Sequence, residues 1–598
     1  MQQQVESKLS GSQREWRLRQ GLETQDSDLH LQKLQAETGL SEWTLRVCWA
    51  RGLRDAASVL SFLGPRLDAL SDPYCCADMD SLVNRLVRAR ELGESILIYG
   101  DYDVDGTTGA ALLYRGLSEF GFTRLSVRQP DRFKEGYGVH AHVMDEALEQ
   151  GVRVVLTVDC GITSFVALER ARELGLDVLV VDHHQLDPVR GLPPAVAVVN
   201  PQRPDCPSGL KQLCGCGLAF TALRALRSRG RDLKWWPLGQ EPNLKQHLDL
   251  VVIATAADIV PLTGENHILV RHGMEVLKNS KKPGVKALLQ AAGLEGKDLS
   301  PGHLGFTLGP RINASGRMGS AGTALELLVT DDALRARDLA LELERVNKER
   351  ADVQNEIWDQ VKVKVEAGLS QGLYQHAIVV SDLGWHEGVV GIVASRVTET
   401  FQKPAIVMSA KQEEGYAKGS VRSYGGKDVL GGLQACASLL KTFGGHKHAA
   451  GVSVLLDNLD AFMRAFDAAI GALPQDADAL PLYVEGECSV EDFNLKTLQE
   501  LESLGPFGPG NPEPVFVCSA RVKGHRVLKE RHLKLQLGGD RAGIEAIWFH
   551  AAENRAVYSP DALEVLFEEA EFAAVPEINR FRGNQTPTLR IRDWRLKL

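Results

Sequence analysis

The chain has 598 residues, of which 44% are hydrophobic and 24% charged, a composition typical of globular proteins. A length of this order accommodates about three to five domains. With 78 acidic and 68 basic residues, the formal net charge is −10. This charge argues against a protein that coats nucleic acid through bulk positive charge, but it is compatible with local basic surfaces.

Membrane insertion and secretion are not expected. No segment approaches the run of about 20 apolar residues that spans a bilayer. The start, Met1–Glu6, lacks a charged segment followed by an apolar core, so we expect no secretory signal. The ten cysteines have no paired spacing and resemble reduced thiols, which favours a cytoplasmic location. Cys206, Cys214 and Cys216 leave a zinc site open, but without a CxxC motif, buried or loop thiols are favoured.

The first part of the chain is expected to be mainly helical and to lead into an α/β domain. Residues 1–60 form an N-terminal helical region with a polar, glutamine-rich start that is expected to fray. Helical patterns continue to about residue 90. Strand and helix patterns then alternate to about residue 330, which predicts one α/β domain over 61–330.

Three apolar segments of that domain are expected to be strands buried on both faces of a parallel sheet. They are Ser95–Tyr99, Val154–Val158 and Val178–Val181. The carboxyl ends of neighbouring parallel strands face one crevice, where ligands bind. We therefore expect the residues that follow these strands to lie close together.

Acidic and histidine side chains follow all three strands. They are Asp101, Asp103, Asp105, Asp159, Asp182, His183 and His184. Converging carboxylates repel one another unless protons or cations neutralise them. Oxygen and imidazole ligands suit Mn²⁺ or Mg²⁺. For Asp101, Asp103 and Asp105 alone, a solvated acidic turn around Gly106 is as good an interpretation as a metal site. Because acidic or histidine residues follow all three strands, a metal site is favoured.

The paired histidines are the more specific signal, because a lone histidine is more often a hydrogen-bonded core or surface residue. Successive residues that leave a strand point to opposite sides. We therefore expect one of His183 and His184 to bind metal and the other to support it or to contact the substrate.

A long helical pattern runs from Asp331 to Val365, with apolar residues spaced three, four and seven apart and an interruption at Arg350. A helix over 331–370 would span about 50 Å and could connect two domains. An ordinary bundle helix is the alternative.

Two further domains are expected after this helix. A second α/β domain is predicted over 371–465, followed by a linker at Pro474–Asp478. Short strand patterns and turns over 466–598 predict a small β-barrel or sandwich. Basic residues at 521–534, and basic residues interleaved with aromatic ones at 580–597, suit a surface that binds single strands, with a merely solvated strand face as the alternative.

The motifs at the strand ends resemble those of the DHH phosphoesterase superfamily. The resemblance is carried by Asp103-x-Asp105, Asp159, Asp182-His183-His184 and Asp258. Further segments resemble the RecJ family, the exonucleases of that superfamily that are specific for single-stranded DNA. These segments are 99–106, 130–138, 310–317, 385–396, 418–423 and 444–446. Within them, Arg311–Arg317 is expected to be a basic loop whose arginines grip phosphate oxygens, with structural arginines paired to carboxylates as the alternative. The resemblance covers about residues 60 to 520.

The resemblance implies a role for each matching residue. One or two Mn²⁺ or Mg²⁺ ions would be bound by Asp103, Asp105, Asp159, His183 and Asp258. Asp101 and His184 would support catalysis. The DNA and its 5′ phosphate would be held by Arg132, Asn313, Arg317, Ser420, Arg422 and His446. Tyr99 departs from the pattern, because some relatives carry a ligating histidine there, so we expect lighter coordination of the first metal.

The fold and function implied by the resemblance are those of a metal-dependent 5′→3′ exonuclease that releases 5′ mononucleotides in DNA repair and recombination. A DHH domain and a DHH-associated domain, both α/β, would be joined by the long helix and followed by an oligonucleotide-binding (OB-like) barrel. Water would attack the phosphodiester in line, because the chain has no GxSxG elbow for a serine nucleophile. The implied partners are a single-strand-binding protein and a helicase, and we expect a monomer.

Two alternatives remain open from the sequence. A DHH phosphoesterase acting on nanoRNA, cyclic dinucleotides or pyrophosphate would share the metal chemistry but needs no C-terminal barrel. A catalytically inactive DNA-binding scaffold would be expected to lack several of the acidic side chains, and all of them are present.

Overall fold

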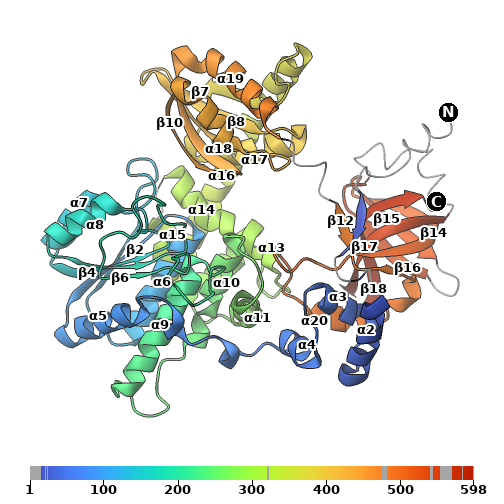
Figure 1. Cartoon of the computed structure of the whole chain (residues 1–598), viewed down its shortest axis with the longest axis horizontal. Coiled ribbons are helices and arrows are strands. Elements are labelled where there is room, and N and C mark those ends of the chain that lie inside the picture. The colour runs from blue at the N-terminus through green and yellow to red at the C-terminus, as the bar shows by residue number, and fades with distance from the viewer. Residues whose placement is uncertain are drawn as a thin grey trace. The chain divides into compact units, whose positions relative to one another are not determined.

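The computed structural model describes residues 15–19, 22, 25–319, 322–474, 481–538, 543–551, 569–581 and 583–596. The glutamine-rich start, the linker residues 475–478, and Arg582 and Lys597 of the last basic run lie outside the described residues. The chain forms two compact units (Figure 1): residues 72–258 and 273–479 make one, and segments of 1–71, 259–272 and 480–598 make the other. No described helix is long and apolar enough to cross a membrane.

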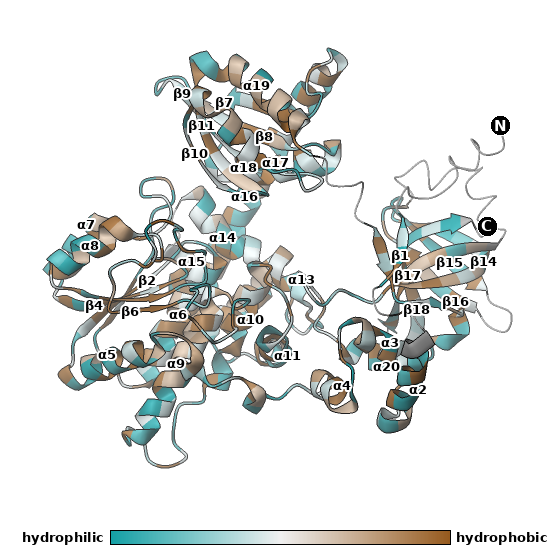
Figure 2. Cartoon of the chain, in the orientation of Figure 1, coloured by the Kyte–Doolittle hydropathy of each residue, from teal (hydrophilic) through white to brown (hydrophobic). Residues whose placement is uncertain are grey.

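A five-stranded sheet forms the centre of the larger unit. Its order is β3-β2-β4-β5-β6, and all of its strands are parallel. The strands are β2 (Ser95–Gly100), β3 (Leu125–Arg128), β4 (Val152–Val158), β5 (Asp177–Val181) and β6 (Ala197–Val199). Figure 2 shows β2 and β4 in the brown of hydrophobic residues, in keeping with the burial of their side chains. The predicted parallel sheet is confirmed.

Helices cover both faces of this sheet. On one face, α7 (Ala141–Glu149) and α8 (Phe165–Glu173) bury apolar side chains against β2, β4 and β5. On the other face lie α5 (Met79–Leu92), α6 (Val104–Glu119) and α9 (Gly215–Asp232). This layering is the one expected for a parallel sheet, whose crossover connections place helices on its faces.

A helical segment follows the sheet. It comprises α10 (Leu248–Ala257), α11 (Glu265–Lys278), α12 (Pro283–Ala291), α13 (Pro301–His303), a π-helix (Leu304–Leu308), α14 (Gly309–Met318) and α15 (Gly322–Val329). The prediction of a basic loop at Arg311–Arg317 is wrong, because this segment lies in α14. Pro310 stands in the first helical turn, where its missing N–H costs little, and Ile312 and Ala314 are buried.

The predicted long helix is confirmed as α16, which runs over 38 residues from Ala333 to Ser370. Asp332 caps its start, since the carboxylate accepts the Leu334 N–H at 2.8 Å. The first half of α16 contacts α12, α14 and α15, whereas its second half packs against the second sheet. One helix therefore joins the two α/β domains.

The second sheet has the order β10-β11-β9-β8-β7. Its strands are β7 (Ile378–Leu383), β8 (Ala405–Lys411), β9 (Tyr416–Arg422), β10 (Leu440–His446) and β11 (Ala449–Leu455). Only β7 and β8 are parallel. The second half of α16 and α17 (Glu387–Phe401) cover one face, and α18 (Val429–Ala435) and α19 (Leu459–Ala472) cover the other.

The smaller unit contains a closed five-stranded barrel. The ring runs β14-β15-β16-β18-β17 and is closed by pairing of β17 with β14. Its strands are β14 (Phe516–Leu528), β15 (His532–Gly538), β16 (Gly543–Trp548), β17 (Glu569–Phe581) and β18 (Asn584–Leu596). The shorter β12 (Leu482–Val484), β13 (Glu487–Cys488) and α20 (Leu495–Ser503) precede the barrel. The predicted OB-like barrel is confirmed.

The N-terminal helices belong to the core of this barrel unit. Leu31 of α2 (Gln25–Thr38), Leu45 of α3 (Glu42–Ala50) and Val59 of α4 (Ala56–Leu63) share one apolar cluster with barrel side chains such as Phe516. The expectation of a mainly helical start did not include β1 (Trp16–Leu18), which pairs in parallel with β12. The pairing places Trp16 and Leu18 against a second apolar cluster around Val515.

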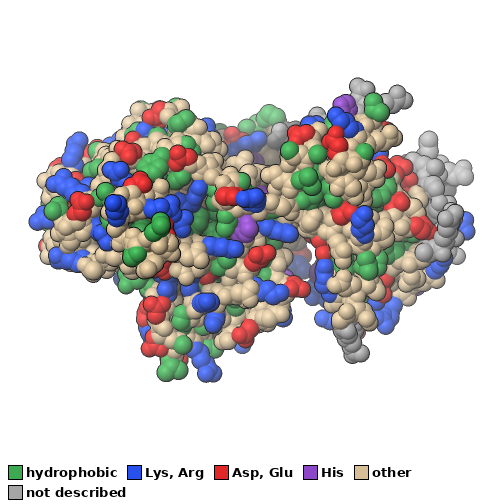
Figure 3. Space-filling view, turned by 90° about the horizontal axis from the view of Figure 1, so that it is seen from below, with side chains coloured by type: hydrophobic (Ala, Val, Ile, Leu, Met, Phe, Trp, Pro, Cys, Tyr) green, Lys and Arg blue, Asp and Glu red, His purple; other side chains and the backbone are tan. Residues whose placement is uncertain are grey.

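Charge is mixed over the surface. Figure 3 shows acidic and basic side chains interspersed on the face that it draws. The net charge of −10 is therefore not gathered into one acidic surface on that face.

A buried ion pair holds α10, the helix that ends just before Asp258. The Lys282 ammonium donates to Asp249 Oδ1 at 2.9 Å and to the Gln246 carbonyl at 2.6 Å. Lys282→Met should lower the free energy of unfolding by about 3–5 kcal/mol, because it leaves a buried carboxylate without its cation. Equilibrium urea unfolding of the whole chain measures this loss.

The matched control is Lys278→Met, which removes an ammonium that pairs with Asp298 at 2.8 Å on the surface. An exposed pair of this kind contributes at most about 1 kcal/mol. Equal losses in the two variants would contradict the importance of the buried pair.

Candidate metal centre and adjoining arginine cluster

The first strand end delivers three carboxylates through the start of α6. Asp101 follows β2 directly and is buried. Asp103 is the N-cap of α6, and its Oδ1 accepts the Gly106 N–H at 3.1 Å. Asp105 lies in the first turn of the same helix, where a negative charge is favoured by the helix dipole.

Asp105 is also tied to a second helix. Its two carboxylate oxygens accept the N–H groups of Gly215 at 2.6 Å and Cys216 at 2.8 Å, at the N-terminus of α9. The N-termini of α6 and α9 therefore meet at this one carboxylate. The positive ends of both helix dipoles stabilise its charge.

Asp159 follows β4 and adopts a left-handed backbone conformation with φ of 60°. Such a conformation costs energy for a residue other than glycine and is concentrated at functional sites. Gly215 of α9 packs directly against it: a Cβ at position 215 would lie 2.7 Å from the Asp159 Cβ. Glycine is therefore required for α9 to begin this close to the strand end.

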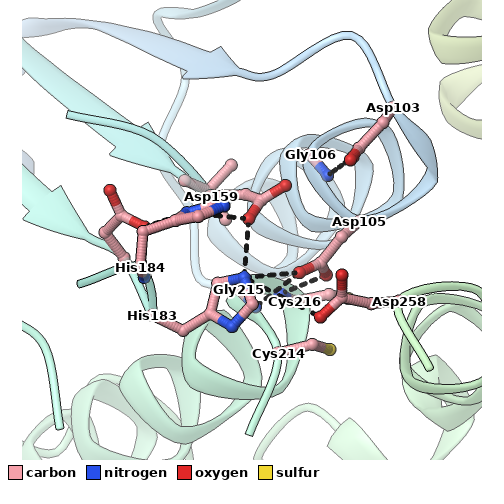
Figure 4. Close-up of polar contacts among 12 residues, drawn as sticks. Asp103, Asp105, Gly106, Asp159, His183, His184, Cys214, Gly215, Cys216 and Asp258 are labelled. Atoms are coloured by element: carbon pink, nitrogen blue, oxygen red, sulfur yellow. Dashed lines mark hydrogen bonds and ion pairs between the residues drawn. The ribbon is translucent and has the colours of Figure 1, made fainter. Parts of the chain in front are cut away.

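His183, which follows β5, lies at the centre of the carboxylates (Figure 4). Its Nε2 is 3.1 Å from Asp159 Oδ1 and 3.8 Å from both Asp105 Oδ2 and Asp258 Oδ2. Asp258 reaches this point from the C-terminal end of α10 rather than from a strand. We call Asp101, Asp103, Asp105, Asp159, His183 and Asp258 the acid–histidine cluster.

The donor atoms of this cluster suit divalent cations. Two sets that share no residue, Asp105/His183/Asp258 and Asp101/Asp103/Asp159, each bring three ligand atoms within 4.8 Å of one another. Among the described residues, the buried Asp101 Oδ1 has no hydrogen-bond partner, and the buried Asp159 Oδ1 has only the His183 imidazole beside it, at 3.1 Å. Unpaired buried carboxylate oxygens are costly unless they meet a cation. Oxygen and imidazole ligands are those that Mn²⁺ and Mg²⁺ accept.

The electrostatics lead to the same conclusion. Burial, reinforced by the neighbouring carboxylates, raises the pKa of Asp101 and Asp159 well above the usual range and that of Asp258 to about 8. Burial lowers the pKa of His183, which favours the neutral imidazole that binds metals. A cation would replace protons as the neutralising charge.

Asp182 and His184 support the cluster from behind. Asp182 Oδ2 accepts the Ile162 N–H at 3.0 Å, and its Oδ1 lies 2.8 Å from His184 Nδ1. Burial opposes protonation of His184, but the hydrogen bond and charge of Asp182 prevail and raise the pKa of the imidazole to about 9. Tyr137 Oη lies 3.2 Å from the same Nδ1 and donates to the Asp159 carbonyl at 3.3 Å. The two histidines thus differ in environment, as expected.

Three of the predicted phosphate-binding residues gather at the start of α17. Arg317 donates to the Gly388 carbonyl at 3.1 Å. A Cβ at Gly391 would lie 2.9 Å from Ser420 Oγ and 3.2 Å from the Arg422 guanidinium, so glycine permits the close approach of β9. Burial lowers the pKa of both Arg317 and Arg422, and Arg132 lies near enough for its charge to lower both further. We call Arg132, Arg317, Ser420 and Arg422 the arginine cluster.

The guanidinium groups of this cluster repel one another. Burial and the charges of Arg132, Arg350 and Arg422 lower the pKa of Arg317 to about 10. In the described part of the chain, no carboxylate forms an ion pair with Arg132, Arg317 or Arg422. A cluster of this kind is a binding site for an anion such as phosphate.

Tyr102 lies between the two clusters. The Arg132 guanidinium is 5.0 Å from the centre of its ring. Burial and the charge of Asp101 raise the pKa of Tyr102 to about 12, while Arg132 and Arg317 oppose that shift. The acid–histidine and arginine clusters therefore adjoin each other.

The other predicted site residues are not brought into these clusters. Asn313 lies on α14, and His446 is exposed at the end of the edge strand β10. Among the described residues, no hydrogen bond or ion pair joins either of them to the clusters. Tyr99 is fully buried, and its hydroxyl donates to the Gly138 carbonyl at 3.1 Å rather than facing the metal ligands.

The cysteines do not form a zinc site in the described part of the chain, where no group of three metal-binding side chains includes a thiol. Cys214 Sγ lies 3.8 Å from Thr255 Oγ1, and Cys206 Sγ lies 3.2 Å from Ser208 Oγ. These are the buried and loop thiols that the sequence favoured.

The interpretation of the sequence missed Tyr137, Gly215 and Gly391. The sequence around Tyr137 could have indicated a functional residue, because glycines flank it within a polar segment. Gly215 and Gly391 had none, because their importance lies in contacts with residues distant in sequence.

Family profiles match three parts of the chain. They are described as "DHH family, N-terminal domain" over residues 95–255, "DHHA1 domain" over 374–472 and "RecJ OB domain" over 484–593.

Curated relatives match over most of the chain. The single-stranded-DNA-specific exonuclease RecJ of Bacillus subtilis is 34% identical over 548 residues, which cover 91% of this chain and 66% of that protein. The protein of the same name from Haemophilus influenzae is 34% identical over 537 residues, covering 87% of this chain and 91% of that protein.

Solved structures agree with these matches. The crystal structure of Thermus thermophilus RecJ in complex with Mn²⁺ superposes with a TM-score of 0.80 at 29% identity and covers 98% of this chain and 80% of that chain. The Mg²⁺ complex gives a TM-score of 0.74 at 28% identity, with 98% and 79% covered. Both ions are those that the acid–histidine cluster suits.

Gly215→Ala should weaken Mn²⁺ binding at least tenfold. The added Cβ would displace either Asp159 or the amides that hold Asp105, and changes next to ligands typically cost 10–100-fold in metal affinity. Titration calorimetry of metal-stripped protein with Mn²⁺ measures the affinity.

Gly217→Ala is the matched control on the same helix. A Cβ at that position meets its nearest atom, the Leu213 Cβ, at an ordinary 3.5 Å. Mn²⁺ affinities that fell equally in both variants would show that the effect arises from α9 in general and not from the contact with Asp159.

Proposed function

The chain belongs to the RecJ family of single-stranded-DNA-specific exonucleases, and from this premise we propose how its residues divide the work of a metal-dependent 5′→3′ exonuclease. The proposed reaction hydrolyses the P–O3′ bond that follows the first nucleotide. It releases a 5′ mononucleotide and leaves a new 5′ phosphate on the remaining strand. DNA repair and recombination are the processes that need such an end-directed activity.

The observation that carries the proposal is the adjacency of the acid–histidine cluster and the arginine cluster at Tyr102. An arginine cluster without acidic partners suits the terminal phosphate, and a metal centre beside it suits the next phosphodiester. The phosphate left by each cleavage is the group that the arginine cluster binds in the next cycle. This arrangement supports stepwise digestion from the 5′ end.

The residues of the acid–histidine cluster fit two cations. We assign Asp105, His183 and Asp258 to one ion and Asp103 and Asp159, with Asp101 in support, to the other. When bound, Mn²⁺ or Mg²⁺ would activate the attacking water and neutralise charge on the scissile phosphate.

The remaining residues bind and orient. Asp182 holds the His184 ring through Nδ1, so that its Nε2 is left to hold or donate a proton at the scissile phosphate. Arg132, Arg317 and Arg422 bind the terminal phosphate, and Ser420 adds a hydroxyl donor. Asn313 and His446 are proposed to contact DNA that lies beyond these clusters.

The barrel favours DNA over a smaller substrate. Outward-facing strand residues Arg521, Lys523 and Arg526 are exposed, and the half-exposed ring of Phe549 lies beside His532. Basic grooves with aromatic side chains suit single strands. A DHH phosphoesterase for nanoRNA or cyclic dinucleotides would not need this unit, and an inactive scaffold would not need intact ligands.

The cellular setting follows from the substrate. We propose that the protein acts as a monomer in the cytoplasm on DNA supplied by a helicase and a single-strand-binding protein. The proposal rests on the need of such an enzyme for an accessible single strand.

The decisive experiment digests end-labelled single-stranded DNA with metal-stripped protein to which Mn²⁺ or Mg²⁺ is returned. Substrates blocked at the 5′ end or at the 3′ end give the polarity. We expect metal-dependent release of mononucleotides that only the 5′ block stops. Cleavage of short oligoribonucleotides or cyclic dinucleotides without degradation of DNA would favour the alternative.

Asp159→Asn should reduce the rate of digestion more than about a hundredfold. Changing a residue that only holds a metal ligand in place already costs about 10–100-fold in activity, and Asp159 is assigned as a ligand itself. The fold should be retained. Burial and neighbouring carboxylates raise the pKa of Asp159, so its ionised form destabilises the metal-free protein at neutral pH, and asparagine removes that charge.

Asp145→Asn is the control. Asp145 lies on α7, pairs with Arg170 at 2.7 Å on the surface and belongs to neither cluster. Digestion rates and urea midpoints in the presence of a chelator test both variants. A digestion rate for Asp159→Asn near that of the wild type would contradict the assignment of Asp159 as a metal ligand.

Arg422→Ala should weaken binding of 5′-phosphorylated DNA by about 10–100-fold, because a hydrogen bond to a charged group contributes about 1.5–3 kcal/mol. Binding of the same strand with a 5′ hydroxyl should change far less. Arg464→Ala removes an exposed arginine from α19, on the opposite face of the same sheet, and should leave both affinities unchanged. A preference for the 5′ phosphate that survives Arg422→Ala would move the anchor elsewhere.

A further inference from the structure

An aromatic ring projects from a tightly held loop beside the arginine cluster. Phe133 is 41% exposed and follows Arg132 directly in sequence. Neither the metal centre nor the phosphate contacts described above use this ring.

The loop that carries Phe133 is rigidly fixed. Asp131 Oδ1 accepts the Phe133 N–H at 2.9 Å. Glu135 in turn accepts the Asp131 N–H at 2.5 Å and bonds Arg128 at 3.0 Å and His142 at 2.7 Å. A ring held in place before binding loses little conformational entropy when a ligand stacks on it.

Two residues, His386 and Gly388, connect the ring to Arg317 of the arginine cluster. Phe133 meets the His386 ring edge-on, with centroids 5.7 Å apart at 87°. His386 caps α17, because its Nδ1 accepts the Gly388 N–H at 3.1 Å. The Gly388 carbonyl is the group to which Arg317 donates. The contact between the two rings is perpendicular and leaves Phe133 41% exposed to solvent.

We propose that Phe133, steadied by His386, is a stacking platform for the base of the 5′-terminal nucleotide. This inference rests on the proposed function, in which the arginine cluster holds the phosphate of that same nucleotide. The base is joined to its phosphate through a single sugar, so it lies near the residue that follows Arg132. Stacking on one aromatic ring accepts every nucleobase, as an enzyme that digests any sequence requires.

The test compares two 5′-phosphorylated single strands that differ only in the terminal nucleotide, which carries a base in one and is abasic in the other. Binding is measured by fluorescence anisotropy with Ca²⁺ in place of Mn²⁺. Phe133→Leu should weaken binding of the first strand by about tenfold, the typical loss for one base–aromatic stack. It should leave binding of the abasic strand within about twofold of wild type.

Two further variants sharpen the test. Phe133→Trp should restore binding of the strand with the terminal base, because a larger aromatic ring stacks at least as well. Lys134→Ala changes the neighbouring exposed residue, and any loss that it causes should be equal for the two strands. Far-UV circular dichroism and urea midpoints check that the exposed substitutions leave the fold intact.

Equal losses for the two strands with Phe133→Leu would assign the ring a structural role and overturn the inference, as would no loss for either. Failure of the proposed function looks different. It would appear in the wild-type protein, as the absence of any preference for a 5′ phosphate and of any release of 5′ nucleotides.

Discussion

Three of the carboxylates that converge in this protein are held in place by backbone amides. Asp105 accepts two amides at the start of α9, Asp103 accepts one at the start of α6, and Asp182 accepts one from Ile162. These bonds fix the positions of charges that repel one another. The packing of the sheet and its helices offsets the repulsion between these charges. A bound cation would reduce that repulsion.

The close approach of helices to strand ends makes this possible. Gly215 lets α9 begin against Asp159, and Gly391 lets α17 lie against Ser420 and Arg422. The start of α9 supplies backbone amides to Asp105, and the first turns of α17 leave space for Arg422. The two clusters meet at Tyr102, so the electrostatic potential changes from negative to positive over a short distance there. In the proposed function, this change of sign would orient a strand with its terminal phosphate toward the arginine cluster and its following phosphodiester toward the metal centre.

Much of this arrangement could be predicted from the sequence, because it depends on local patterns. Apolar runs that end in Asp101, Asp159 and Asp182 are recognisable as buried parallel strands, and parallel strands bring their ends together. Asp258 follows a helix and has no such pattern, so only the resemblance to a family indicated it. The helix at Arg311–Arg317 was mistaken for a loop, because its basic residues outweighed the buried Ile312 and Ala314.

Other features depend on contacts between distant residues, and no local pattern encodes them. The contact of Gly215 with Asp159 and the closure of the barrel by β14 and β17 are of this kind. The pairing of β1 with β12 also belongs here, because it joins segments some 460 residues apart. A strand of three residues has no periodicity by which it could be recognised.

This last pairing has a consequence for biosynthesis. The catalytic unit, interrupted by residues 259–272, lies in the chain between the first and the last segment of the barrel unit, so all of its residues are synthesised before the barrel strands. At about 5–20 residues per second, the helices that carry Leu31, Leu45 and Val59 wait on the order of a minute for the partners that bury them. During that interval, the apolar side chains of these helices lack the barrel residues that bury them in the finished protein.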